Sequence, residues 1–151
     1  MNSVRFIANA AGGLLPVLAS ALKQTFDAVI LTSYGMTECM PISSPTQSYN
    51  MDPTGTSGQP VGPDIIITDD TRKIVLPPGE TGNILIRGAP CFAGYESSDP
   101  SLYNESFFTV GGEAGWFDTG DTGYLDEKSF LFISGRSKEV MCICCIWDVP
   151  G

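Results

Sequence analysis

The stretch "RFIANAAGGLLPVLASALKQTFDAVIL" (residues 5–31) decides the fold class, because it reads as a strand, a helix and a second strand. Residues 5–8 are a short strand candidate, and a pair of glycines follows it. Over residues 14–26 apolar side chains recur at helical spacing, and Pro16 lies in the first turn, where its missing N–H does no harm. Residues 28–31 are continuously apolar, as in a central parallel strand covered on both faces. The succession predicts an α/β sheet.

The chain changes character after residue 43, where Pro, Gly, Ser and Thr become dense up to residue 63. The short apolar runs that follow are separated by turn residues. They predict strands over residues 64–68, 73–76, 83–87, 121–126 and 129–134. The fold class expected from the whole chain is therefore α/β followed by a small antiparallel β-domain.

Composition excludes several classes of function. The net charge is −9 and the basic residues do not cluster, so a nucleic-acid surface is not expected. The absence of histidine excludes Ser-His and Cys-His triads, and Cys142, Cys144 and Cys145 give only a weak metal signal. No apolar run is long enough to span a bilayer, and no secretory signal is visible. We expect reduced thiols and a cytoplasmic protein, although an organellar targeting signal could lie upstream.

The residues Tyr34 to Glu38 follow the second predicted strand and allow two interpretations. In the first, Thr37 and Glu38 cap a helix and Tyr34 packs, which this stretch alone favours. In the second, they form part of a nucleotide site at the carboxyl end of a strand. A tyrosine ring can stack on a purine, a threonine hydroxyl can donate to phosphate, and a glutamate can hold magnesium.

A second polar cluster, within residues 115–140, favours the nucleotide interpretation. Asp121 stands at the start of a predicted strand, where its carboxylate can accept hydrogen bonds from both ribose hydroxyls. Arg136 follows the next predicted strand, and its cationic fork suits a ribose hydroxyl or a phosphate. An aromatic ring, a hydroxyl, two carboxylates and an arginine together predict a nucleotide site.

At this point the sequence resembles the adenylate-forming superfamily of AMP-dependent synthetases and ligases. This superfamily includes acyl-CoA synthetases, aryl-CoA ligases, luciferases and the adenylation domains of peptide synthetases. The motifs that carry the resemblance occur in the family's order: "NAAGGLLP" (9–16), "YGMTE" (34–38), "GTSGQPVGP" (55–63), "GETGNILIRGAPCFAGY" (79–95), "WFDTGD" (116–121) and "GRSKEV" (135–140).

The resemblance implies a fold and a reaction. Residues 1–50 would be the end of a Rossmann-like αβ subdomain, which is the C-terminal part of the nucleotide-binding subdomain. Residues 51–134 would form a distorted antiparallel β-barrel subdomain, and residues 135–151 a hinge motif and a divergent tail. Such enzymes activate a carboxylic acid with MgATP, through an acyl adenylate, and then form a thioester, often with coenzyme A.

The resemblance also implies roles for individual residues. Thr37 and Glu38 would be catalytic, with Thr37 on phosphate and Glu38 on Mg²⁺. ATP or AMP would be bound by Gly12, Tyr34, Gly35, Thr37, Asp121 and Arg136, with Tyr34 stacked on adenine and Asp121 and Arg136 on ribose. Lys138 would be the hinge about which a C-terminal domain rotates. Gly94-Tyr95 is interpreted as a turn and a packing tyrosine, and Cys39 and Cys91 as packed thiols.

Two features of the family are missing from the sequence. No phosphate loop with a lysine precedes Asn9, and after residue 141 the chain reads "CICCIWDVPG" in place of the small domain that carries a catalytic lysine. We therefore expect a ligase fragment, connected with fatty acid metabolism, that is inactive alone and has the remainder of the enzyme as a possible partner. The alternatives are a non-catalytic nucleotide-binding or interaction module, a peptide-synthetase-like adenylation fragment, and an active enzyme.

Overall fold

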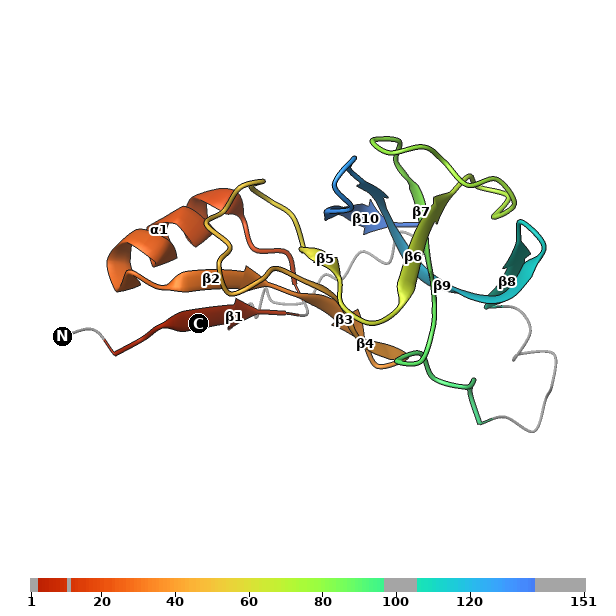
Figure 1. Ribbon diagram of the computed structural model, residues 1–151, viewed down its shortest axis with the longest axis horizontal. Coiled ribbons are helices and arrows are strands. Elements are labelled where there is room, and N and C mark those ends of the chain that lie inside the picture. Colours follow the sequence, from red (N-terminus) through yellow and green to blue (C-terminus); the bar gives the residue numbers. More distant parts are fainter. Residues whose placement is uncertain (1–2, 11, 97–105, 138–151) are drawn as a thin grey trace, which may run out of the picture.

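The computed structural model describes residues 3–10, 12–96 and 106–137. The first part of the chain is a strand, a helix and a second strand: β1 (Phe6–Asn9), α1 (Pro16–Phe26) and β2 (Val29–Thr32). The strands β1 and β2 pair in parallel, and α1 lies beside them (Figure 1). This confirms the α/β prediction for the first part, with boundaries shifted by one or two residues. No helix in the described residues is both long enough and apolar enough to cross a membrane.

Local sequence explains the limits of α1. Pro16 is the first helical residue, where the helix needs no N–H from it. Asp27 ends the helix in the left-handed conformation, with φ 49°, which an aspartate tolerates better than most residues. Ala19 is the buried residue of the helix, and its small side chain lets α1 approach the sheet closely.

The chain then forms a hairpin, and residues 34–44 contain strands and a turn in place of the helix that a cap at Thr37 would begin. The strands β3 (Tyr34–Met36) and β4 (Cys39–Ser44) are antiparallel, and β5 (Gln59–Pro60) adds to β4. Thr37 and Glu38 occupy the two-residue turn between Met36 and Cys39, which face each other across the hairpin. The helix-cap interpretation of Thr37 and Glu38 is therefore wrong, because β4 buries Cys39 and Ile42 by pairing as a strand.

The second part of the chain is a five-stranded antiparallel sheet with the order β10-β9-β7-β6, in which β8 also pairs with β9. Its strands are β6 (Asp64–Thr68), β7 (Gly82–Arg87), β8 (Phe107–Val110), β9 (Glu113–Leu125) and β10 (Leu131–Arg136). Figure 1 shows these strands curving around one side of the molecule. An antiparallel β-unit after the α/β unit is thus confirmed, whereas the division at residues 50 and 134 stays a prediction.

Individual strand predictions met different outcomes. The strand 64–68 has the predicted bounds, and β7 and β10 lie within one or two residues of theirs. The predicted strand 73–76 is wrong, because only Val75 bridges to Thr68 there and Asp69 instead closes a tight turn with the amides of Lys73 and Ile74. The predicted strand 121–126 is only the end of β9, and β8 was not predicted.

The β-unit contains its own core. Ile84, Leu85 and Ile86 on β7 are fully buried, which means that β7 is covered on both faces. One face packs on Ile42 of β4, while Leu85 on the other face packs with Trp116. Burial of one such side chain contributes roughly 1.5–3 kcal/mol.

Residues 56–58 join the two parts of the chain. The Thr56 hydroxyl donates to the carbonyl of Leu131 at 2.8 Å, and the Thr32 hydroxyl donates to the carbonyl of Thr56 at 2.6 Å. Gly58 has φ +86°, and a Cβ on it would lie 2.0 Å from the main chain of Ser44. Only glycine fits this close approach, so residues 56–58 are one of the places where the β-unit is fixed against β2 and β4.

Candidate functional site

A cavity of about 650 Å³ lies where the α/β part meets the β-unit. This is large enough for a nucleotide-sized ligand. Five of the predicted site residues line it: Gly12, Tyr34, Gly35, Asp121 and Arg136. Residues from β3, β9 and β10, far apart in the sequence, therefore converge on one space, as the nucleotide interpretation requires.

Asp121 lines this cavity, and its carboxylate contacts two other lining residues. The Tyr34 hydroxyl donates to Oδ2 of Asp121 at 2.6 Å. Nε of Arg136 lies 3.2 Å from Oδ1 of the same carboxylate, and the two residues face each other across the β9–β10 pair. Asp121 was expected at the start of a strand but lies well inside β9. Its position opposite Arg136 follows from the strand register, which the sequence alone does not give.

Burial changes the chemistry of Tyr34. Desolvation raises the pKa of its phenol far above the usual value, and the hydrogen bond to Asp121 raises it further. The phenol is therefore neutral at any physiological pH and acts toward Asp121 as a donor. The side chain of Arg136 is 68% exposed, so its ion pair with Asp121 is screened by solvent and contributes little to stability.

Thr119 is a site residue that sequence reasoning missed. It lines the cavity, and its hydroxyl donates to the carbonyl of Ile84 at 2.9 Å while accepting the Asp121 N–H at 3.1 Å. The hydroxyl thereby holds the main chain of Asp121 against β7. The available signal was its place two residues before Asp121 in "WFDTGD", since a threonine hydroxyl often bonds to the amide two residues on.

Thr37 and Glu38 are not among the residues that line the cavity. Thr37 is exposed and Glu38 half-buried at the tip of the β3–β4 hairpin. Oε1 of Glu38 accepts a hydrogen bond from the Tyr95 hydroxyl at 2.7 Å, and the Glu38 carbonyl accepts the Phe92 N–H at 2.7 Å. Tyr95 packs edge-on against Phe92, as its interpretation as a packing tyrosine expects, but it also contacts a predicted catalytic residue.

Two side chains near this hairpin, those of Tyr95 and Cys39, are held in their neutral forms. Desolvation, followed by the hydrogen bond to Glu38, raises the pKa of Tyr95 to about 12. The thiols of Cys39 and Cys91 lie 3.5 Å apart, and Cys39 is buried. Burial raises the pKa of Cys39 to about 12, so its thiol is protonated and a poor nucleophile.

The described residues offer no ready-made metal cage, since they hold no group of three or more His, Cys, Asp or Glu placed to bind one ion. A single carboxylate such as Glu38 nevertheless fits Mg²⁺, which commonly takes one or two carboxylates together with substrate phosphates and water. Lys138 and the cysteines 142, 144 and 145 lie outside the described residues.

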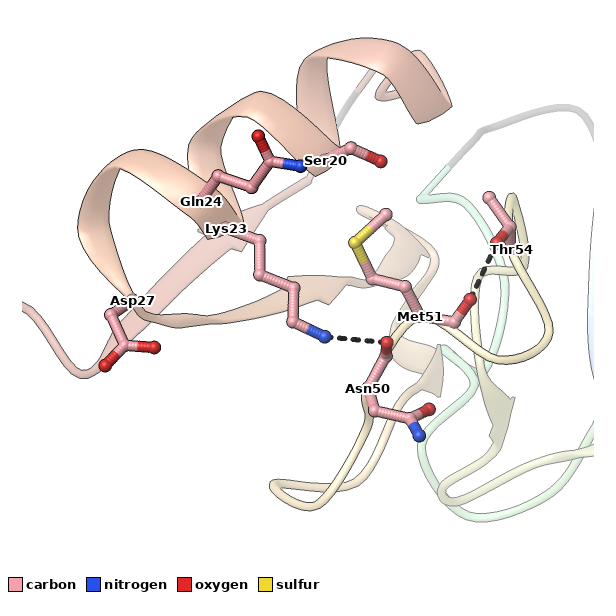
Figure 2. Close-up of a pocket in the computed structure, with 7 residues that line it drawn as sticks. All are labelled: Ser20, Lys23, Gln24, Asp27, Asn50, Met51 and Thr54. Atoms are coloured by element: carbon pink, nitrogen blue, oxygen red, sulfur yellow. Dashed lines mark hydrogen bonds between the residues drawn. The ribbon is translucent and has the colours of Figure 1, made fainter.

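A second pocket, of about 550 Å³, lies between α1 and the segment 50–54 and contains none of the predicted site residues. Figure 2 shows Lys23 of α1 reaching across it, and Nζ of Lys23 donates to the carbonyl of Asn50 at 2.7 Å. The Thr54 hydroxyl donates to the carbonyl of Met51 at 2.7 Å on the far side. The Lys23 contact ties the loop to the helix, and the Thr54 contact closes a turn within the loop, so we assign the pocket a structural role.

Comparison with known proteins gives consistent matches. The AMP-binding enzyme family is matched over residues 1–96. The oxalate–CoA ligase of Saccharomyces cerevisiae is 37% identical over 142 residues, which are 91% of this chain and 25% of that protein. The chain thus spans about a quarter of the length of the curated relatives it matches.

Solved structures agree with these sequence matches. A long-chain-fatty-acid–CoA ligase from Archaeoglobus fulgidus superimposes with a TM-score of 0.77 at 26% identity, over 91% of this chain and 29% of that one. The o-succinylbenzoate CoA synthetase of Bacillus subtilis, in complex with its acyl-adenylate intermediate, gives 0.76 at 30% identity, over 91% and 27%. The latter enzyme has also been solved with ATP and magnesium ion. The resemblance drawn from the motifs is confirmed.

Proposed function

The chain belongs to the AMP-binding enzyme family, and we propose that it is part of an AMP-dependent CoA ligase, supplying the ribose side of the nucleotide site. The observation that carries this proposal is the convergence of Tyr34, Asp121 and Arg136 on one cavity. The whole enzyme would join a carboxylic acid to AMP from MgATP and then transfer the acyl group to coenzyme A.

Asp121 has the hydrogen-bonding capacity for this role. An ionised carboxylate offers about four acceptor positions. Tyr34 and Arg136 use one each, on different oxygens, so each oxygen keeps one position for a ribose hydroxyl. Tyr34 and Arg136 orient the carboxylate, and Thr119 fixes the main chain behind it. The ribose would bind to a carboxylate that is already in place.

We also propose that this chain alone does not form an acyl adenylate. Among the described residues that line the cavity, Arg136 is the one cationic side chain. The pyrophosphate that leaves carries several negative charges, and loss of a single stabilising contact typically costs about 10²–10³ in rate. Thr37, with Mg²⁺ on Glu38, would offset only part of that charge. A non-catalytic nucleotide-binding module is therefore the second candidate.

The remainder of a larger enzyme is the proposed partner. Leu15 is 71% exposed and Val17 82% exposed, and both lie at the start of α1 beside a sheet that has two parallel strands in the described part of the chain. Parallel sheets usually have both faces covered. The match covers 25% of the length of the yeast oxalate–CoA ligase, which supports the same conclusion.

Titration of AMP into the chain, followed by calorimetry, tests the site. Asp121→Ala removes both ribose acceptors and should weaken AMP binding by about 2–3 kcal/mol. Asp64→Ala removes an exposed carboxylate at the start of β6, outside the cavity, and should leave the affinity unchanged. Equal affinities for wild type and Asp121→Ala, or no saturable binding by wild type, would contradict the proposed site.

Exchange of labelled pyrophosphate into ATP tests the inactivity. Oxalate, 2-succinylbenzoate, and medium- and long-chain fatty acids should give no exchange above a control without acid. Acid-dependent exchange that Glu38→Ala abolishes would show a complete ligase. Saturable AMP binding without exchange by this chain, even with the remainder of a relative added, would favour the non-catalytic module.

A further inference from the structure

The segment 91–95, which follows β7, holds the Thr37–Glu38 turn at several points. The Phe92 N–H donates to the Glu38 carbonyl at 2.7 Å, and Cys91 pairs with Cys39 in an isolated antiparallel bridge. The thiols of those two cysteines lie 3.5 Å apart. These contacts fix the main chain of the turn. The Glu38 carboxylate then accepts a hydrogen bond from the hydroxyl of Tyr95.

The ring of Tyr95 is held independently of its hydroxyl. It packs edge-on against Phe92, with ring centroids 4.8 Å apart, and Phe92 in turn stacks on Phe107 and contacts Phe117 edge-on. Tyr95 itself is 47% exposed. Removal of its hydroxyl therefore leaves the ring contacts in place and costs little stability, so a large effect on ligand binding would come from the hydrogen bond to Glu38.

We infer that Tyr95 is a positioning residue for the Glu38 carboxylate: its hydroxyl holds Oε1 at 2.7 Å and leaves Oε2 for a divalent cation that arrives with the nucleotide phosphates. The inference rests on the proposed function. A cation bound through one carboxylate depends strongly on how that carboxylate is oriented, because Mg²⁺ demands near-octahedral geometry. Loss of such a hydrogen bond to a metal ligand typically costs 10–100-fold in metal affinity.

Paramagnetic broadening by Mn²⁺ tests this inference on the ¹⁵N-labelled full chain, with and without ATP. In wild type the broadening should centre on the amides of residues 37–39. Tyr95→Phe should need about tenfold more Mn²⁺ for the same broadening. Glu38→Gln should remove the localised effect, and adding Tyr95→Phe to it should change nothing further. Tyr124→Phe, whose ring stacks on Phe132 in the β-unit, is the matched control and should behave as wild type.

Binding of AMP without metal separates positioning from structural damage. Tyr95 does not line the cavity, so Tyr95→Phe should bind AMP as wild type does. Equal Mn²⁺ broadening in Tyr95→Phe and wild type overturns the inference, and so does a parallel loss of AMP and Mn²⁺ binding. Wild type could also show Mn²⁺ broadening at residues 37–39 that Tyr95→Phe weakens, and yet bind no AMP. That outcome would support the inference and contradict the proposed nucleotide function. The absence of both responses from wild type overturns both.

Discussion

The two parts of the chain differ in how far they bury similar apolar side chains. On β7, Ile84, Leu85 and Ile86 are fully buried, whereas Val17 and Leu18 on α1 are 82% and 50% exposed. The strands of the β-unit are covered by its own side chains together with Cys39 and Ile42 of β4, while α1 lies beside the parallel pair β1 and β2 (Figure 1). This difference indicates that the β-unit can be stable within this chain. The α/β part, in contrast, has apolar surface that a further part of a larger protein would cover.

The largest effect should follow from a cavity in the β-unit. Ile84→Ala removes a fully buried side chain from the centre of β7 and should lower the free energy of unfolding by about 3–4 kcal/mol. Val75→Ala, at a position 51% exposed beside the same sheet, should cost well under 1 kcal/mol. Urea unfolding followed by tryptophan fluorescence measures both. Similar losses for the two variants would mean that the β-unit has no well-packed core.

A smaller loss is expected at the junction of the two parts. Gly58→Ala places a methyl group 2.0 Å from the main chain of Ser44 in a left-handed conformation, and should cost about 2–3 kcal/mol. Gly79→Ala has almost the same φ, +87°, but nothing within 4 Å, so it should cost about 1 kcal/mol from conformation alone. Urea unfolding gives the free energy of unfolding of both variants, and the difference between their losses measures the clash of the added methyl group with the main chain of Ser44. If that difference is zero, residues 56–58 do not hold the parts together.

Stability at low pH should depend on Asp69, which closes the turn after β6. Hydrogen bonds from Thr71 and from the amides of Ile74 and Lys73 lower the pKa of Asp69 from 3.8 to about 2. A depressed pKa stabilises the fold above the unfolded value, and this stabilisation disappears as the pH falls from about 4 to about 2. Asp69→Asn should therefore flatten the stability curve over that interval. Asp70→Asn, its exposed neighbour, is the control, and matching curves for Asp69→Asn and wild type would exclude the effect.

The smallest effect on stability should come from α1. Val17→Ser alters a side chain that makes few contacts and should change the free energy of unfolding by no more than about 0.5 kcal/mol. It should nevertheless reduce self-association, because exposed apolar residues and open strand edges drive aggregation. Size-exclusion chromatography should show aggregates for wild type and fewer for Val17→Ser. A monodisperse wild type that melts cooperatively would show that the α/β part needs no cover.

Short-range features of the fold could be predicted from local residue patterns alone. The strand–helix–strand order follows from apolar periodicity and Pro16, and residues 64–68 contain a short apolar run between turn residues, so both were predicted. The sequence pattern gave wrong strand bounds where a glycine could either end a strand or lie within it. Gly115 and Gly120 have positive φ within β9, and the strand continues through them, whereas the predicted strand began only at residue 121, directly after Gly120. The long strand and its partner β8 were therefore missed.

The contacts between polar side chains, in contrast, could not be predicted from local patterns and became visible in the folded chain. Tyr34 and Asp121 are 87 residues apart and Glu38 and Tyr95 are 57 apart, yet each pair forms a short hydrogen bond. The motifs indicated candidate residues for the site, because residue type carries chemical capacity. The partners depend on strand register and on how the β3–β4 hairpin sits against the β-unit. Those are set by long-range packing of buried side chains, which no local pattern of the sequence encodes.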